Sequence, residues 1–332
     1  MSDRLEVAAR ESALAAVREA GAQVERFTLA ARRVPAPADG VAVRHLFGWS
    51  APRALRRALA RSGEFDLLHT CSTATARIAA RARPDLPLLI EYDGEALLAG
   101  EPAEELTLAA VVVVPSTGVA HAAQAAGARV ALVVAPGCAG PVGGHAPWPD
   151  PPRLVSAAPL VGRQRHGDVL RTLAVLGDRY PTLRYDVIGE GPEREALGAL
   201  AERLGVQARI DWHGPLEADA ARERLGAATI LAMPSVDEPF GVAYIEAMAA
   251  GVPAIGCRGE PGPEEIAAAG DGITLVPPGD IERLSQRIDE LLGDPARLRE
   301  ASMRARATAA EHFSLAQHAE LMLAAYGAAA AR

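Results

Sequence analysis

Two glutamates stand eight residues apart where a strand, a loop and a helix are predicted to follow one another. Residues 230–233 have the pattern of a buried strand, residues 234–240 that of a loop and residues 242–250 that of a helix. A glycine and a proline bring that helix to an end. Glu238 therefore lies in the loop and Glu246 in the helix, so the two carboxylates flank a helix start.

That helix start is itself a predicted anion site. Backbone N–H groups around Gly241 and Val242, together with the positive end of the helix dipole, attract a phosphate. Glu246 can accept hydrogen bonds from two ribose hydroxyls, and Glu238 can accept them from sugar hydroxyls. The arrangement suits a nucleotide-sugar. Metal binding by the two acids is the weaker interpretation, and a plain strand-loop-helix with solvated acids is the other alternative.

Length and composition limit the classes of protein to consider. A chain of 332 residues with 49% hydrophobic content supports two cores. The net charge of −8 argues against nucleic acid as a partner, and no apolar run approaches the roughly 20 residues that span a bilayer. The start of the chain lacks a secretory pattern, and its three scattered cysteines fit a reducing compartment, so we expect a cytoplasmic protein.

Cysteines and basic residues narrow the chemistry further. Cys71, Cys138 and Cys257 are odd in number and far apart, which argues against a disulfide framework and against a zinc cluster. All 34 basic residues are arginine. Any phosphate contact must therefore use arginine, histidine or the backbone.

Short β-branched runs alternate with helical stretches, which is the pattern of doubly wound parallel sheets. A segment rich in proline and glycine, residues 136–152, separates two such sheets. We predict an N-terminal Rossmann-like domain, residues 1–148, and a C-terminal one, residues 149–314, facing each other across a ligand-binding cleft. The predicted strands are residues 23–29, 41–47, 65–70, 86–92, 110–115 and 130–135 in the first sheet, and 153–158, 184–189, 208–212, 229–233, 252–257 and 272–276 in the second.

The segment around the acids resembles retaining glycosyltransferases of family 4, which have the two-domain GT-B fold. The resemblance covers residues 110–326 well and the first hundred residues loosely. Its motifs are Pro234-Ser235, Glu238, Phe240-Gly241, Glu246-Ala247-Met248-Ala249, Gly251-Val252-Pro253, Pro136-Gly137, Gly189-Glu190-Gly191-Pro192-Glu193, the glycine-rich turn of residues 259–265 and His312-Phe313-Ser314.

The resemblance implies transfer of a sugar from a nucleoside-diphosphate sugar to an unknown acceptor with retention, without a cofactor or a metal. It implies that residues 315–332 return to the N-terminal domain. Glu238 would act on the sugar hydroxyls and on the developing positive charge, and Glu246 would hold the ribose. The other donor-binding residues that it implies are Phe240, Gly241, Val242, Gly259, Gly262, Gly189 and His213.

The chain departs from the family at the donor's diphosphate. Alignment on the family's first C-terminal strand puts Pro159 at the expected arginine and Gln164 at the expected lysine. Losing two charged hydrogen bonds without replacement weakens binding of the donor or of the transition state by roughly 3–6 kcal/mol. Arg163 and Arg165 either replace these cations in catalysis or are solvated, in which case the enzyme is weak or inactive.

On the acceptor side, His69 matches a histidine common in the family at a strand end, and Tyr92 and Asp93 follow the next strand. A turn without a chemical role is the alternative for Tyr92 and Asp93. The chain opens in a predicted helix, residues 5–20, so the family's first strand and glycine-rich loop are expected to be missing.

That departure allows a minimal enzyme, a truncated product or a subunit whose N-terminal domain a partner completes. An inactive GT-B subunit that binds or activates a partner glycosyltransferase is accordingly our second hypothesis, and an epimerase or phosphorylase ranks last. Arg53, Arg56, Arg57 and Arg61 with Leu55 and Leu59 form a pattern seen in peripheral membrane helices, with a solvated face as the alternative.

Overall fold

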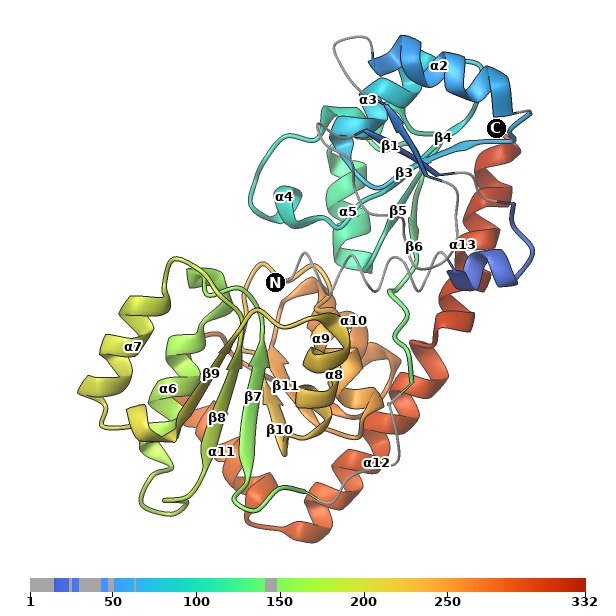
Figure 1. Cartoon of the computed structure of the whole chain (residues 1–332). Helices are drawn as coiled ribbons and strands as arrows, with labels where there is room; N and C mark the ends of the chain where they lie inside the picture. The colour runs from blue at the N-terminus through green and yellow to red at the C-terminus, as the bar shows by residue number, and fades with distance from the viewer. Residues whose placement is uncertain (1–14, 24–25, 30–42, 47–50, 63, 141–147) are drawn as a thin grey trace. The chain divides into compact units, whose positions relative to one another are not determined.

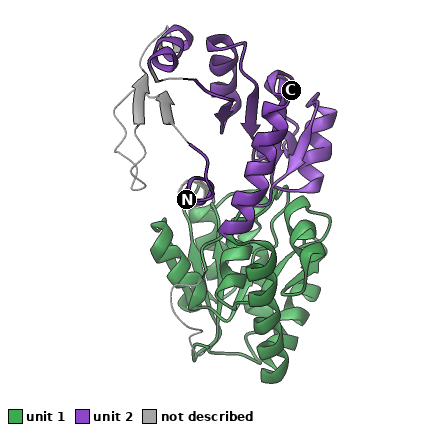
Figure 2. Ribbon diagram, turned by 90° about the vertical axis from the view of Figure 1, so that its right-hand side faces the viewer, with its two compact units in different colours: residues 1–10, 137–314 green, residues 11–136, 315–332 purple. Residues whose placement is uncertain are grey.

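The computed structural model describes residues 15–23, 26–29, 43–46, 51–62, 64–140 and 148–332. The chain divides into two compact units (Figure 2). The C-terminal unit contains Gly137–Ser314, and the N-terminal unit consists of Glu11–Pro136 together with Leu315–Arg332. No helix among the described residues is both long and apolar enough to cross a membrane.

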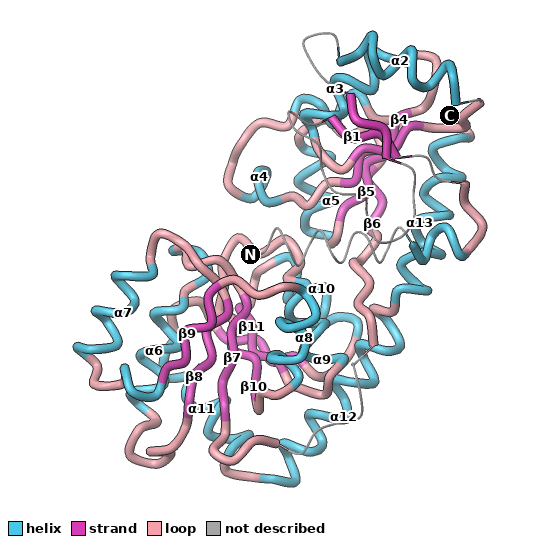
Figure 3. The backbone as a smooth tube through the Cα atoms, viewed as in Figure 1, coloured by secondary structure: helices cyan, strands magenta, loops and turns pink. Residues whose placement is uncertain are grey.

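The C-terminal unit is built on one parallel sheet, seen as the lower magenta layer in Figure 3. Its strand order is β12-β11-β10-β7-β8-β9, so the chain leaves β7 toward one edge and returns beside β7 as β10. This order is that of the Rossmann fold, whose switch point lies here between β7 and β10. The strands are β7 (Arg153–Ala157), β8 (Arg184–Ile188), β9 (Ile210–Gly214), β10 (Ile230–Ala232), β11 (Ala254–Cys257) and β12 (Ile273–Val276).

Helices follow nearly every strand of this unit and bury its apolar faces (Figure 1). One core joins Leu154, Tyr185 and Ile230 of the sheet to Leu170 and Ile288 of the helices. The helices are α6 (His166–Val175), α7 (Arg194–Arg203), α8 (Ala218–Gly226), α9 (Val242–Ala249), α10 (Pro261–Ala269), α11 (Ile281–Leu292) and α12 (Pro295–His312), with 3-10 turns η2 (Gly162–Gln164) and η3 (Gln207–Arg209).

The N-terminal unit contains two parallel sheets among its described residues. β3 (Leu68–Thr70), β4 (Leu88–Glu91), β5 (Val111–Val114) and β6 (Ala131–Val133) form one, in the order β3-β4-β5-β6. β1 (Arg26–Leu29) and β2 (Val43–Leu46) pair only with each other. The prediction of one six-stranded sheet was therefore wrong, because within the described residues no strand joins the pair to the other four.

Side chains of the four-stranded sheet alternate between two cores, as expected for strands buried on both faces. Leu88 and Ile90 pack against α3 and α5, whereas Leu89, Val111 and Val113 pack against α13 on the other face. The helices are α2 (Ala51–Ser62), α3 (Thr73–Ala82), α4 (Glu95–Leu98), α5 (Thr117–Ala125) and α13 (Leu315–Ala330), with the 3-10 turn η1 (Glu104–Leu108).

The twelve predicted strands each overlap a strand of the structure, which confirms that part of the prediction. For the predicted N-terminal helix, residues 15–19 are helical, and residues 5–14 lie outside the described residues.

The arginine-rich helix α2 directs its apolar residues into the protein. Leu55 and Leu59 are buried against Ala82, and the Arg56 guanidinium donates to the Ala82 carbonyl over 2.8 Å. The apolar positions that suggested a peripheral membrane helix are thus covered by α3 and its neighbours.

Candidate functional site

The loops after β7 and β10 meet at the switch point of the C-terminal sheet. These strands pair directly, so the loops leave the same edge side by side. The Val236 amide donates to the Arg163 carbonyl over 2.8 Å, which ties the two loops together. Arg163 and Gln164 come from the first loop and Glu238 from the second. The structure thereby brings three of the residues singled out in the sequence to one place.

Glu238 is 7% exposed and touches both loops and the glycine-rich turn. Its Oε2 accepts from the Gln164 side-chain amide at 3.5 Å and lies 3.9 Å from the Arg163 guanidinium. The Glu238 backbone amide donates to the Glu260 carboxylate over 3.1 Å, and the Glu238 carbonyl accepts from Gly262. Every polar group of Glu238 named here thus helps to fix the carboxylate in place.

Glu246 lies on α9 and is 9% exposed. Its Oε2 has no hydrogen-bond partner. Burial raises the pKa of Glu246 from 4.5 to about 7, although the positive charge of Arg222 on α8 acts in the opposite direction. At the start of the same helix, Gly241 has φ +84° and no side chain caps the helix. A buried acceptor and an uncapped helix start therefore belong to one element.

This buried acid predicts a pH-dependent stability. The folded state binds a proton at Glu246 up to about pH 7, whereas the unfolded chain releases it near pH 4.5. Stability from this group is thus present below pH 4.5 and is lost as the pH rises to about 7, by about 2–3 kcal/mol. We expect Glu246→Gln to match the wild type near pH 5 and to exceed it near pH 8 in urea unfolding. An equal stability difference at both pH values would contradict the assigned burial.

The predicted cations differ in their surroundings. Arg163 donates to the Asp237 carbonyl at 3.4 Å beside Glu238. Arg165 is held instead on its own helix, where its Nη2 lies 2.6 Å from Asp168 Oδ2. Of the two replacements considered in the sequence, only Arg163 lies against the acid.

The sequence predicted that Gln164 removes a positive charge from the site, because it stands where the family has a lysine. In the structure it is 4% exposed, it donates to Glu238, and its Oε1 has no hydrogen-bond partner. Glu260 was missed altogether, since its role depends on a long-range contact with the Glu238 amide. Burial raises the pKa of Glu260 as well. For Gln164, its alignment with the family's lysine was the one sequence feature that predicted a place in the donor site.

Two of the glycines predicted to bind the donor, Gly262 and Gly189, allow close backbone packing. A Cβ on Gly262 would lie 2.1 Å from Phe240 Cα, and one on Gly189 would lie 2.0 Å from the Ala158 carbonyl oxygen. Gly259 has φ +83° and donates to Glu264 Oε1 over 2.8 Å. Phe240 is buried and stacks edge-on against Phe313, with ring centroids 5.7 Å apart. Val242 is the first residue of α9.

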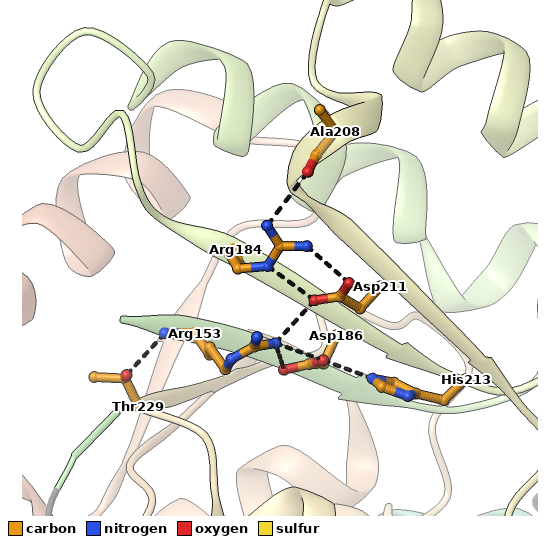
Figure 4. A network of polar contacts seen from close by, with 7 residues as sticks. All are labelled: Arg153, Arg184, Asp186, Ala208, Asp211, His213 and Thr229. Carbon is orange, nitrogen blue, oxygen red and sulfur yellow. Dashed lines mark hydrogen bonds and ion pairs between the residues drawn. The ribbon is translucent and has the colours of Figure 1, made fainter. Parts of the chain in front are cut away.

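The side chain of His213 belongs to a polar network along the sheet (Figure 4). Its Nε2 lies 2.6 Å from Asp186, whose carboxylate also accepts from Arg153 over 2.9 Å. Hydrogen bonds from Arg184 hold the pKa of neighbouring Asp211 at about 2. The network binds β7, β8 and β9 together, so the His213 imidazole is engaged within the protein.

In the N-terminal unit, the predicted acceptor-side residues do not lie together. His69 Nε2 lies 3.2 Å from Glu91 Oε2, and its Nδ1 lies 3.0 Å from the Tyr326 hydroxyl of α13. Tyr92 is buried in the core on the opposite face of the sheet, with Ile90. Asp93 accepts from the Glu95 amide at the start of α4 over 3.1 Å. His69 and Tyr92 therefore do not share a site.

The model of the family described as "Glycosyl transferases group 1" matches residues 145–310. A D-inositol 3-phosphate glycosyltransferase of Nocardia farcinica is 36% identical over 209 residues, which cover 61% of this chain and 44% of the relative. The chain spans less than half the length of the curated relatives it matches.

Solved structures share the fold over nearly the whole chain. Sucrose-phosphate synthase from Thermosynechococcus elongatus has a TM-score of 0.78 at 18% identity, covering 97% of this chain and 92% of that one. The lipopolysaccharide outer core galactosyltransferase WaaB has a TM-score of 0.73 at 19% identity, with 95% and 94% covered. Anabaena HepE, solved with UDP and glucose, has a TM-score of 0.72 at 18% identity, with 86% of each chain covered. The predicted GT-B α/β fold is confirmed by this likeness.

Proposed function

The chain belongs to the glycosyl transferases group 1 family, and from this membership we propose that it transfers a sugar from a nucleoside-diphosphate sugar to an acceptor. The proposal includes retention at the anomeric carbon and a place in family 4. It places the donor at the switch point of the C-terminal sheet, where ligands of such folds bind beyond the carboxyl ends of the strands.

The buried carboxylate of Glu246 carries the proposal. Glu246 Oε2 is a buried acceptor without a hydrogen-bond partner, which destabilises a protein by about 1–3 kcal/mol. A bound ligand that donates a hydrogen bond to this oxygen would offset that cost. Two neighbouring ribose hydroxyls supply such donors. Glu238, held by the opposite loop, would then meet the hydroxyls of the sugar and the positive charge that develops as the glycosidic bond breaks.

The diphosphate needs positive charge between these acids. The uncapped start of α9 offers backbone amides at Gly241 and Val242, and Arg163 offers a guanidinium beside Glu238. Gln164 would contribute a neutral amide where the family has a lysine. The donor site proposed here uses no metal ion, since arginine and helix dipole take that role.

A nucleotide titration of the full chain tests the proposal. We expect calorimetry to detect micromolar binding of one among UDP, GDP and ADP or their sugar conjugates. Arg163→Ala should weaken that binding by about 10–100-fold, because it removes one charged hydrogen bond. Arg171→Ala is the control, since Arg171 is half exposed on α6 and pairs with Asp168.

Two results of this titration would contradict parts of the proposal. Binding that Arg163→Ala leaves unchanged would remove Arg163 from the diphosphate site. Absence of binding for every nucleotide would favour the second hypothesis, an inactive subunit that acts on a partner glycosyltransferase, which the uncharged Gln164 and Pro159 motivate.

A further inference from the structure

Three ligand-type side chains converge at the carboxyl ends of two neighbouring strands in the N-terminal unit. His69 and Cys71 are two residues apart and so point to the same face of the sheet. The pairing of Thr70 with Ile90 places Glu91 opposite Cys71. One imidazole, one thiol and one carboxylate thus share a corner, and their ligand atoms lie within 4.8 Å of one another.

The distances between these atoms match the edges of a metal tetrahedron. The observed separations are 3.2 Å from His69 Nε2 to Glu91 Oε2, 3.8 Å from Cys71 Sγ to His69 Nε2 and 3.7 Å from Cys71 Sγ to Glu91 Oε2. Zinc bonds of about 2.0–2.3 Å at tetrahedral angles require edges of about 3.3 Å between nitrogen and oxygen and about 3.6 Å to sulfur. Small adjustments would bring all three atoms onto one ion.

The imidazole is already oriented by a second contact. Its Nδ1 lies 3.0 Å from the Tyr326 hydroxyl, and the two rings meet edge-on at 5.7 Å. Tyr326 belongs to α13, which packs on this face through the core that contains Leu89. Metal-binding histidines commonly have such a partner on the other ring nitrogen, which leaves Nε2 free to coordinate.

The site is accessible to solvent, and its donor atoms favour a zinc-type ion. Cys71 is exposed, and the side chains of His69 and Glu91 are 18% and 25% exposed, so an ion can enter from solvent. Sulfur with imidazole nitrogen selects zinc or cobalt rather than magnesium or calcium. We propose that His69, Cys71 and Glu91 bind a divalent zinc-type cation, with the fourth coordination position open to water or to a small ligand.

The residues of this site lie in the N-terminal unit, whereas the proposed donor site lies in the C-terminal unit. The site also revises the expectation that no metal cluster would form. Cysteine spacing alone predicted no metal cluster, whereas the structure supplies a histidine and a glutamate beside Cys71.

Titration of the full chain with Co²⁺ tests the proposal, followed by competition with Zn²⁺. We expect one ion per chain, a thiolate-to-cobalt charge-transfer band and the intense visible bands of a tetrahedral ion. The other cysteines should not produce that band, because burial raises the pKa of Cys138 and of Cys257 to about 12. Cys71→Ser should abolish the band and lower Zn²⁺ affinity by more than the about 10–100-fold that loss of an outer-shell partner costs.

The remaining variants separate coordination from orientation. Glu91→Gln should weaken Zn²⁺ binding by a similar factor, and Tyr326→Phe by about 10-fold with the same spectrum, because Tyr326 only positions the ring. His121→Asn, an exposed histidine on α5, should bind as the wild type does. A spectrum without the charge-transfer band, or equal affinity in Cys71→Ser, would overturn the proposal.

Discussion

Replacing Glu246 with alanine should weaken binding of the nucleoside-diphosphate donor by about 10²–10⁴-fold. The variant removes an acceptor for two hydroxyl groups, each in a charge-assisted hydrogen bond worth about 1.5–3 kcal/mol. Because the carboxylate is 9% exposed, water cannot readily substitute for it. Calorimetry with the nucleotide that binds the wild type measures the loss.

Protonation supplies an independent signature of the same contact. The pKa of about 7 for buried Glu246 means that the carboxyl is partly neutral at neutral pH, whereas hydroxyl donors favour the ionised form. Wild-type affinity should therefore rise as the pH increases through about 7 and level off above it. Glu246→Gln should bind with intermediate affinity that lacks this rise.

A matched control lies on the adjacent helix. Glu223 of α8 is exposed, so Glu223→Gln changes the net charge equally and should leave affinity within about twofold. Wild-type affinity in both Glu246 variants would show that the donor binds elsewhere, even if the enzyme remains active.

Gly262→Ala should destabilise the C-terminal unit by roughly 3–5 kcal/mol. The added Cβ would lie 2.1–2.4 Å from the Cα, oxygen and carbonyl carbon of Phe240, and a backbone cannot rotate aside as a side chain can. The Gly262 amide also donates to the Glu238 carbonyl, so displacement of this turn should move the acid as well. Urea unfolding measures the stability and calorimetry the accompanying loss of donor affinity.

Alanine substitutions at two other glycines serve as controls for this loss of stability. Nothing lies within 4 Å of a Cβ at Gly259, so Gly259→Ala should cost only the strain of its positive φ, about 1–2 kcal/mol. Gly327 stands in α13 with open space around it, and Gly327→Ala should stabilise that helix by about 1 kcal/mol. Similar losses in Gly259→Ala and Gly262→Ala would mean that backbone contact with Phe240 is not the cause.

The strands were predictable because buried parallel strands are short apolar runs, of which Val111–Val114 is a clear instance. Their partners were less so. The pairing of β1 with β2 depends on which edges are available, and the approach of Glu91 to Cys71 depends on the register of β3 against β4. Neither strand pairing nor strand register can be predicted from the hydrophobic period of a single segment.

In the candidate site, too, local features were predictable and long-range contacts were not. Glu238 and Glu246 were found from a local strand-loop-helix pattern, whereas the contact between Glu238 and Gln164 joins residues 74 positions apart. In α2, apolar spacing could not distinguish a lipid surface from the protein core, because both require the same helical stripe. Long-range contacts of this kind explain most of what the sequence left open.

The last helix has a consequence for the order in which the protein can fold. Leu89, Val111 and Val113 are covered by Ala319, Met322 and Ala325 of α13. A ribosome makes these covering residues only after the whole C-terminal unit has been synthesised. The C-terminal unit can therefore complete its core first, while one face of the earlier sheet stays uncovered until α13 emerges. During synthesis, that face therefore exposes apolar surface that can associate with other chains.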